Sequence, residues 1–285
     1  MSQPAANSAA QPPYQASKLA ILGYGRFGSA LAHLAQEAGL EITAYDVAAE
    51  VPRSLASGSP AELVSEALDV VLAVPTAQTR KALSGLEPHL TPQHMVMDVG
   101  SVKSGPVRAM TDVLGERIPW VATHPLFGSS TIALGERPLM AVVCPNDVHP
   151  HATRRARTFY ERIGCVVTEQ DAHEHDRVMA RSHALAFFVA KALLDMEAGE
   201  HLSFTPPSFK AMARTIELVR ADSAHLFLPI EQENPCAADA RQELLDALSR
   251  VHNELEASDA VVDRAEDRPE SLGIPDLGSD GPELM

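Results

Sequence analysis

Three short motifs contain residue types that a ligand-binding or catalytic site needs. They are G-Y-G-R-F-G at Gly23–Gly28, D-V-G-S-V-K at Asp98–Lys103 and T-H-P-L-F-G-S-S at Thr123–Ser130. Each motif follows or ends an apolar run that predicts a buried strand. Ligands of open α/β sheets bind outside the carboxyl ends of the strands. We therefore expect the three motifs to flank one crevice.

The glycine motif is typical of a dinucleotide-binding turn, because it follows a predicted strand and begins a predicted helix. Gly23 allows the tight turn, and Gly25 lets the backbone approach a pyrophosphate at the helix N-terminus. Gly28 permits close packing of the helix on the strand. Arg26 and Phe27 complete the expected cofactor-binding set. The alternative is a glycine turn that binds nothing.

Asp46 ends the second predicted strand, eighteen positions after Gly28. A carboxylate there can accept hydrogen bonds from the adenosine ribose, and its charge repels a 2′-phosphate. This favours NAD over NADP. Arg53 is the reservation, since a nearby arginine can accept a 2′-phosphate.

Ser101 and His124 follow the next two motif-bearing strands and are expected to flank the cofactor crevice. An ordinary histidine pKa near ~6.5 suits proton removal at neutral pH, so His124 is the candidate general base. The alternative is a loop histidine at a strand end.

The elements that must position these residues change type along the chain. Strand–helix alternation with continuous apolar strands predicts an α/β domain with a mostly parallel sheet covered on both faces. A helical pattern then predicts one long helix over Asp171–Glu200 and three further helices. The expected divisions are a flexible tail over 1–17, the α/β domain over 18–169, a helical domain over 170–256, and an acidic tail over 257–285. The predicted strands are 18–23, 41–46, 69–74, 95–99, 120–124, 139–144 and 165–168; the helices of the α/β domain are 26–38, 60–68, 78–86, 104–115 and 148–163.

Charge, hydropathy and cysteine content further narrow the possible classes of protein. The net charge of −15 argues against nucleic acid as a partner. No apolar run approaches the ~18–20 residues of a membrane span, and no signal peptide is visible. The chain has 3 cysteines and no C-x-x-C pattern, which suits a reducing cytoplasm and predicts no metal site.

The ordered motifs resemble those of the prephenate and arogenate dehydrogenases of tyrosine biosynthesis. H-E-H-D-R at His173–Arg177 resembles the entry to that family's first long helix. The segment Thr205–Pro235 resembles its later helices. The resemblance covers roughly Lys18 to Leu255.

This resemblance implies a Rossmann domain followed by a helical domain that usually dimerises and closes the active site. It implies oxidation of the ring carbon that bears the C4 hydroxyl, hydride transfer to NAD or NADP, and loss of the ring carboxylate as CO2. The family's histidine falls on His124, the base for that hydroxyl. Its serine falls on Ser101, which the resemblance implies makes a second hydrogen bond to that hydroxyl and one on the side of the nicotinamide.

The chain also departs from the family pattern at two substrate-binding positions. A histidine found in many members is replaced by Phe187, with His183 one turn earlier on the same helical face. His183 is expected to reach the same cavity, or to be an ordinary histidine satisfied by its neighbours.

An arginine of many prephenate enzymes is replaced by Leu218. Arg220 is the first candidate for binding the substrate carboxylate, and Arg214 and Lys210 are alternatives. The choice between prephenate and arogenate therefore stays open.

Three alternatives remain. His173, His175 and Asp176 resemble a metal cluster, although a helix start explains them better. The whole chain is alternatively another hydroxy-acid dehydrogenase of the same architecture, or a non-catalytic nucleotide-sensing protein. Retention of both Ser101 and His124 argues against the sensor. We expect the protein to be a cytoplasmic, homodimeric enzyme that binds a small-molecule substrate.

Overall fold

The computed structural model describes residues 18–65, 67–199, 204–222 and 226–259. Its centre is a seven-stranded sheet in the order β2-β1-β3-β4-β5-β6-β7. The first five strands are parallel, β6 runs antiparallel to β5, and β7 is parallel to β6. The strands are β1 Lys18–Leu22, β2 Glu41–Tyr45, β3 Asp69–Leu72, β4 Met95–Asp98, β5 Trp120–Pro125, β6 Leu139–Cys144 and β7 Cys165–Glu169.

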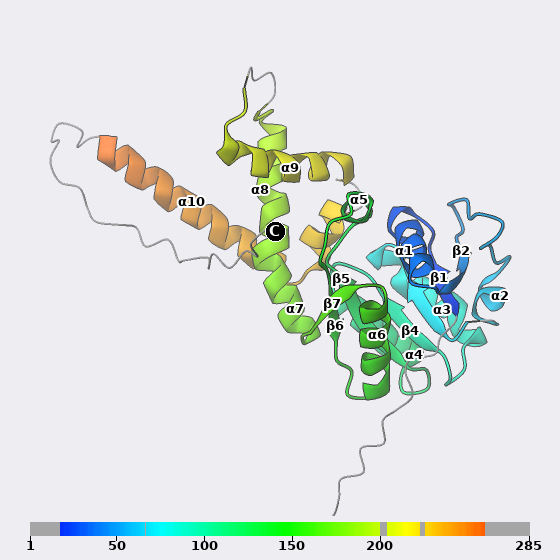
Figure 1. Cartoon of the computed structure of the whole chain (residues 1–285). Helices are drawn as coiled ribbons and strands as arrows, with labels where there is room; N and C mark the ends of the chain where they lie inside the picture. The colour runs from blue at the N-terminus through cyan, green and yellow to red at the C-terminus, as the bar shows by residue number, and fades with distance from the viewer. Residues whose placement is uncertain (1–17, 66, 200–203, 223–225, 260–285) are drawn as a thin grey trace, which may run out of the picture. The chain divides into compact units, whose positions relative to one another are not determined.

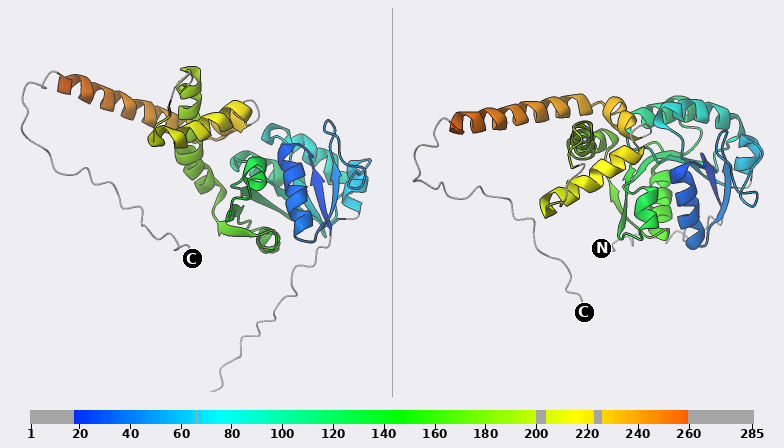
Figure 2. Two further views of the ribbon diagram at one scale, coloured as in Figure 1. Left: turned by 45° about the horizontal axis from the view of Figure 1, so that its top comes forward. Right: turned by 90° about the horizontal axis from the view of Figure 1, so that it is seen from above.

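Helices cover both faces of this sheet, as the right-hand view of Figure 2 shows. On one face, α1 (Arg26–Glu37) and α6 (Pro150–Arg162) bury apolar side chains such as Leu31 and Phe159. On the other face lie α2 (Pro60–Ser65), α3 (Thr79–Leu86) and α4 (Ser104–Leu114). Strands buried on two faces need continuous apolar runs. The short helices η1 (Thr76–Gln78), η2 (Glu87–His89) and α5 (Ser129–Ala133) complete this part.

A helical region follows the last strand (Figure 1). Its core joins Phe187 and Ala190 of α8 to Ile216 and Val219 of α9 and to Ile230 of η5. The segments η3 and η5 are π-helical and pack against each other. The elements are α7 Ala172–Met179, η3 Ala180–Ala184, α8 Leu185–Asp195, α9 Pro207–Asp222, η5 Pro229–Glu233 and α10 Ala237–Asp259.

The predicted fold class is confirmed, with three local differences. The strand at Leu139–Cys144 is antiparallel, helix α5 was not expected, and the long helix predicted over Asp171–Glu200 contains a π-helical segment from Ala180 to Ala184 and ends its regular turns at Asp195. The expected tail over 1–17 lies outside the described residues. Of the expected acidic tail over 257–285, residues 257–259 belong to the last helix, α10, and the rest lies outside the described residues.

The chain divides into two compact units between Gln242 and Glu243, within α10. The domain boundary expected after residue 169 stays a prediction. Among the described residues, no helix combines the length and apolar character that crossing a membrane requires.

Candidate active site

The turn between β1 and α1 has the shape that a dinucleotide needs. Gly23 adopts φ +101°, and a Cβ there would lie 2.4 Å from the Ala73 carbonyl oxygen. A Cβ on Gly28 would lie 2.0 Å from the Gly23 carbonyl oxygen. A Cβ on Gly25 would meet no atom within 4 Å. Gly23 and Gly28 are therefore required by the fold, whereas the space at Gly25 fits the approach of a pyrophosphate to the N-terminus of α1.

Asp46 follows β2 and lies against the same turn. Its carboxylate accepts hydrogen bonds from the backbone N–H groups of Tyr24 at 2.6 Å, Ala48 at 2.7 Å and Ala49 at 2.8 Å. Partial burial opposes ionisation of Asp46, but these backbone hydrogen bonds outweigh it and lower its pKa. An ionised acceptor therefore lies beside the glycine turn, where the sequence predicts the ribose.

Aromatic packing joins the first and third motifs. The ring of Phe27 lies 6.0 Å from that of Phe127, centroid to centroid. Arg26 and Arg53 are exposed near the start of α1 and after β2. The glycine turn and the loop after β5 are consequently neighbours.

A buried charged cluster ties the second motif to the third. The Lys103 ammonium, which is fully buried, contacts the Asp98 carboxylate and donates to the carbonyl oxygen of Thr123. The other Asp98 oxygen accepts from the Thr123 backbone N–H at 3.1 Å, and Gly100 N–H donates to Asp98 at 3.0 Å. These contacts fix the carboxyl end of β4 to that of β5. Ser101 lies half-buried on the loop between β4 and α4.

His124 is buried, with 6% of its surface exposed. Its Nδ1 lies 2.9 Å from Nε2 of His175, and the two rings meet edge to face. Nε2 of His124 has no hydrogen-bond partner in the described part of the chain. Burial first, and then electrostatic interactions with Lys103, His175 and His183, lower the His124 pKa well below its ordinary 6.5. The imidazole is thus neutral at pH 7 and able to accept a proton.

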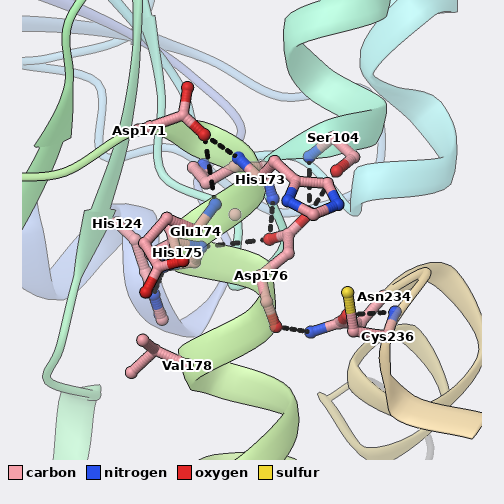
Figure 3. A network of polar contacts seen from close by, with 12 residues as sticks. Ser104, His124, Asp171, His173, Glu174, His175, Asp176, Val178, Asn234 and Cys236 are labelled. Atoms are coloured by element: carbon pink, nitrogen blue, oxygen red, sulfur yellow. Dashed lines mark hydrogen bonds and ion pairs between the residues drawn. The ribbon is translucent and has the colours of Figure 1, made fainter. Parts of the chain in front are cut away.

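The contact from His124 continues into α7 (Figure 3). Nδ1 of His175 lies 3.0 Å from Oδ1 of Asp176, and both side chains are fully buried. Asp176 also accepts from the backbone N–H groups of Lys103 at 2.7 Å and Ser104 at 2.8 Å, and from the Ser104 hydroxyl at 2.6 Å. Asp176 therefore joins α7 to the N-terminus of α4.

The start of α7 is capped by Asp171, whose carboxylate accepts from the backbone N–H groups of His173 and Glu174. His173 is exposed, in contrast to His175. In the described ranges, no group of three or more histidine, cysteine, aspartate or glutamate side chains is arranged to hold a metal ion. A second anchor holds this helix, because the Asn234 amide donates to the Asp176 carbonyl oxygen at 2.8 Å.

The two predicted substrate-binding residues differ in their surroundings. His183 lies in η3, half-buried, with its ring 4.5 Å from that of Phe187. Burial lowers its pKa. It is also one of the groups that lower the His124 pKa. Arg220 lies near the end of α9 and pairs with Glu217, one turn earlier, at 3.7 Å.

Sequence reasoning missed the roles of Lys103, His175 and Asp176. Lys103 belongs to the D-V-G-S-V-K motif, but nothing in its spacing shows that its ammonium is buried. His175 and Asp176 were interpreted only as part of a helix start. The signal available was that adjacent His and Asp residues stand within a segment that resembles a family motif.

The glycine turn and the sheet define a nucleotide-binding fold of the Rossmann type, with a buried histidine at the end of β5. A family model described as "Prephenate dehydrogenase, nucleotide-binding domain" matches residues 41–169. A Methanocaldococcus jannaschii protein named "Probable arogenate/prephenate dehydrogenase" is 24% identical over 190 residues, covering 64% of this chain and 42% of that protein. The chain thus spans under half of that relative's length.

Other relatives cover more of both chains. The 4-amino-4-deoxyprephenate dehydrogenase of Streptomyces pristinaespiralis is 28% identical over 230 residues, covering 78% of this chain and 73% of that protein. The structure of A. aeolicus prephenate dehydrogenase in complex with hydroxyphenyl propionate and NAD+ matches with a TM-score of 0.69 and 20% identity, covering 89% and 93% of the two chains. The family model and the relatives indicate the prephenate/arogenate dehydrogenase family, and the resemblance of the motifs is confirmed. The solved structure shows that the fold is shared.

Proposed function

We propose that this chain oxidises and decarboxylates prephenate, or arogenate, with hydride transfer to NAD. The observation that carries the proposal is His124: a buried, neutral imidazole at the carboxyl end of β5, whose Nε2 has no partner among the described residues. The relatives named above support the substrate class.

The chain's own part in this reaction is proton transfer at the C4 oxygen. When bound, the nicotinamide accepts the hydride that leaves C4. Nε2 of His124 accepts the hydroxyl proton as the C4 carbonyl forms. The ring carboxylate then leaves as CO2, and the electrons of its bond to the ring make the ring aromatic. His124 returns the proton to the resulting phenolate oxygen, so the reaction releases no net proton. Ser101 is proposed to give the second hydrogen bond to the C4 oxygen.

The cofactor-binding residues are proposed to be those of the glycine turn together with Asp46. Gly25 offers the space for the pyrophosphate, and the Asp46 carboxylate lies beside the turn to accept from the ribose. Its negative charge favours NAD, because a 2′-phosphate would be repelled. A preference for NADP in the assay below would contradict this assignment.

Substrate carboxylates need a cation in a protein as acidic as this one. Arg220 remains the first candidate. Of the alternatives, Arg214 is ion-paired with Glu136, and Lys210 is exposed. We expect Arg220→Ala to raise KM by about tenfold or more while kcat changes little, the pattern of lost binding without lost chemistry. An unchanged KM would transfer the role to Arg214 or Lys210.

The deciding experiment offers the purified protein prephenate, arogenate or 4-amino-4-deoxyprephenate, each with NAD or NADP, and follows absorbance of the reduced nicotinamide. The third substrate is included because a relative of that name covers 78% of this chain. Binding of a nucleotide without turnover of any substrate would favour the sensor. Turnover of a different hydroxy acid would favour the other dehydrogenase. A cytoplasmic location and a homodimer remain predictions.

The role of His124 is tested by His124→Ala in the same assay. We expect kcat to fall by about 10²–10⁴-fold, the usual share of general-base catalysis. The affinity for NAD should hardly change, because the glycine turn and Asp46 lie on other strands. A folded variant with wild-type kcat would disprove the mechanism.

A further inference from the structure

His124, His175 and Asp176 form one continuous hydrogen-bonded series. The distances are 2.9 Å between the two histidines and 3.0 Å from His175 to the carboxylate. His175 and Asp176 are fully buried, and His124 nearly so. Water therefore does not compete for these contacts, and each nitrogen must take one role, donor or acceptor.

The direction of the hydrogen bonds is set from the carboxylate end. Burial opposes ionisation of Asp176, but hydrogen bonds from His175, Ser104 and Lys103 outweigh it and lower its pKa. An ionised carboxylate only accepts, so Nδ1 of His175 is the donor to Asp176. Nε2 of a neutral His175 is then an acceptor.

The same reasoning fixes the proton on His124. Because Nε2 of His175 accepts, Nδ1 of His124 carries the hydrogen and donates to it. Nε2 of His124 is left with its lone pair, and no described residue contacts that lone pair through a hydrogen bond. This is the atom to which the proposed mechanism assigns the substrate hydroxyl.

We propose that His175 and Asp176 are positioning residues that hold His124 in the tautomer with its hydrogen on Nδ1 and its basic Nε2 facing the substrate. The inference deepens the proposed function and rests on it only for the kinetic consequence. Neither residue touches the substrate. Their effect would be largest in the transition state, when His124 gains a proton and its Nδ1–H bond to His175 becomes charge-assisted.

Asp176 is well suited to orient His175 because hydrogen bonds from several groups fix its own position. Its second oxygen is held by the Ser104 hydroxyl and the Ser104 backbone N–H. The Asn234 amide holds the Asp176 carbonyl oxygen. A carboxylate fixed in this way fixes the His175 ring, and through it the ring of His124.

The tautomer can be measured without any substrate. In protein labelled with 15N-histidine, we expect the His124 signals above pH 7 to show a protonated Nδ1 and an unprotonated Nε2, assigned by their loss in His124→Gln. In His175→Leu the hydrogen should redistribute toward Nε2. A wild-type His124 with its hydrogen on Nε2 would overturn the proposal, whether or not the protein is active on any of the three substrates.

The kinetic test compares His175→Leu with His175→Gln. Leucine removes the acceptor, and we expect kcat to fall by about 10–100-fold, less than loss of the base itself, while KM changes little. Glutamine places a carbonyl oxygen near the position of Nε2, so it should recover most of the loss. His173→Leu is the matched control: it removes an exposed imidazole from the same helix and should leave kcat unchanged.

The outcomes separate positioning from simple stabilisation. A folded His175→Leu with wild-type kcat, or a His175→Gln no better than leucine at equal thermal stability, would overturn the proposal. The acid limb of the pH–rate profile gives a third readout. In the proposed arrangement His175 is neutral and accepts from Nδ1–H of His124, and this bond strengthens when His124 gains a proton. Leucine removes the acceptor and so disfavours the charged form of His124, while Lys103 and His183, the other groups that lower its pKa, stay in place. The limb should move to lower pH in His175→Leu.

Discussion

Burial keeps the His124 imidazole neutral over a wider range of pH than a histidine in water. The loss of hydration disfavours its charged form, and electrostatic interactions with Lys103, His175 and His183 act in the same direction. At the scale of this residue, the proposed general base is therefore unprotonated at neutral pH. The ionised Asp176 at the other end of the series keeps an electron pair available on Nε2.

The pH dependence of the rate follows from this shift. A general base works when unprotonated, so kcat/KM should be full above the His124 pKa and fall as pH drops through it. Since that pKa is lowered, we expect the acid limb to lie clearly below pH 6.5. The measurement is kcat/KM against pH, and the residual rate of His124→Ala should lack the limb. A limb centred above 6.5 would mean that another group controls the rate.

At the scale of elements, the turn from β1 to α1 separates a structural glycine from a binding glycine. Gly28→Ala places a methyl group 2.0 Å from the Gly23 carbonyl oxygen, so the helix must move. We expect a loss of about 1–3 kcal/mol or more in the free energy of unfolding. Gly25→Ala meets open space and should leave that free energy almost unchanged.

The binding of NAD should respond in a different pattern. The Gly25→Ala methyl group stands where the pyrophosphate is proposed to approach, so we expect the Kd for NAD to rise by about tenfold or more, ~1.4 kcal/mol. Urea unfolding and calorimetric titration of both variants provide the comparison. If Gly25→Ala bound NAD like the wild type, the proposed cofactor site would be wrong.

Most strands could be predicted because a strand that is buried on two faces appears in the sequence as a continuous apolar run. Val70, Val71 and Leu72 are an example, all at 1% exposure or less. The direction of β6 could not be predicted, since an apolar run indicates burial and not orientation. The π-helical segment Ala180–Ala184 was also not predicted, because a shift in backbone hydrogen bonding leaves no clear signal in the sequence.

The candidate site was predictable where one motif supplies its parts. Gly23, Gly28 and Asp46 belong to a local pattern, and the structure places them together. The contact of His124 with His175 joins positions 51 residues apart in the chain. Only the packing of α7 against the sheet domain brings these two residues into contact, and periodicity carries no information about such packing.

At the scale of the whole molecule, the buried histidines link stability to pH. The pKa values of His124 and His183 are both lowered in the native state. Below about pH 6.5 the unfolded chain takes up protons that these native side chains do not bind. Their contribution to stability is therefore fully present above that pH and falls as pH falls toward the native pKa values.

We expect the free energy of unfolding to be lower at about pH 5.5 than at about pH 7.5, with a weaker dependence in His124→Asn. Urea titrations followed by circular dichroism at both pH values measure the difference. If the free energy of unfolding changed by the same amount between the two pH values in the wild type and in the variant, His124 would not contribute to the pH dependence of stability.

The position of Asp176 has a consequence for recombination between relatives. His124, the proposed base, comes from β5, while His175 and Asp176, which are proposed to orient it, come from α7. The Asp176 carboxylate also accepts hydrogen bonds from backbone N–H groups at the start of α4. A crossover placed between β7 and α7 would inherit His124 from one parent and its orienting pair from the other. Chimaeras of this family should therefore keep full activity only when the acquired helix supplies an acceptor at the position of His175, however well each half folds.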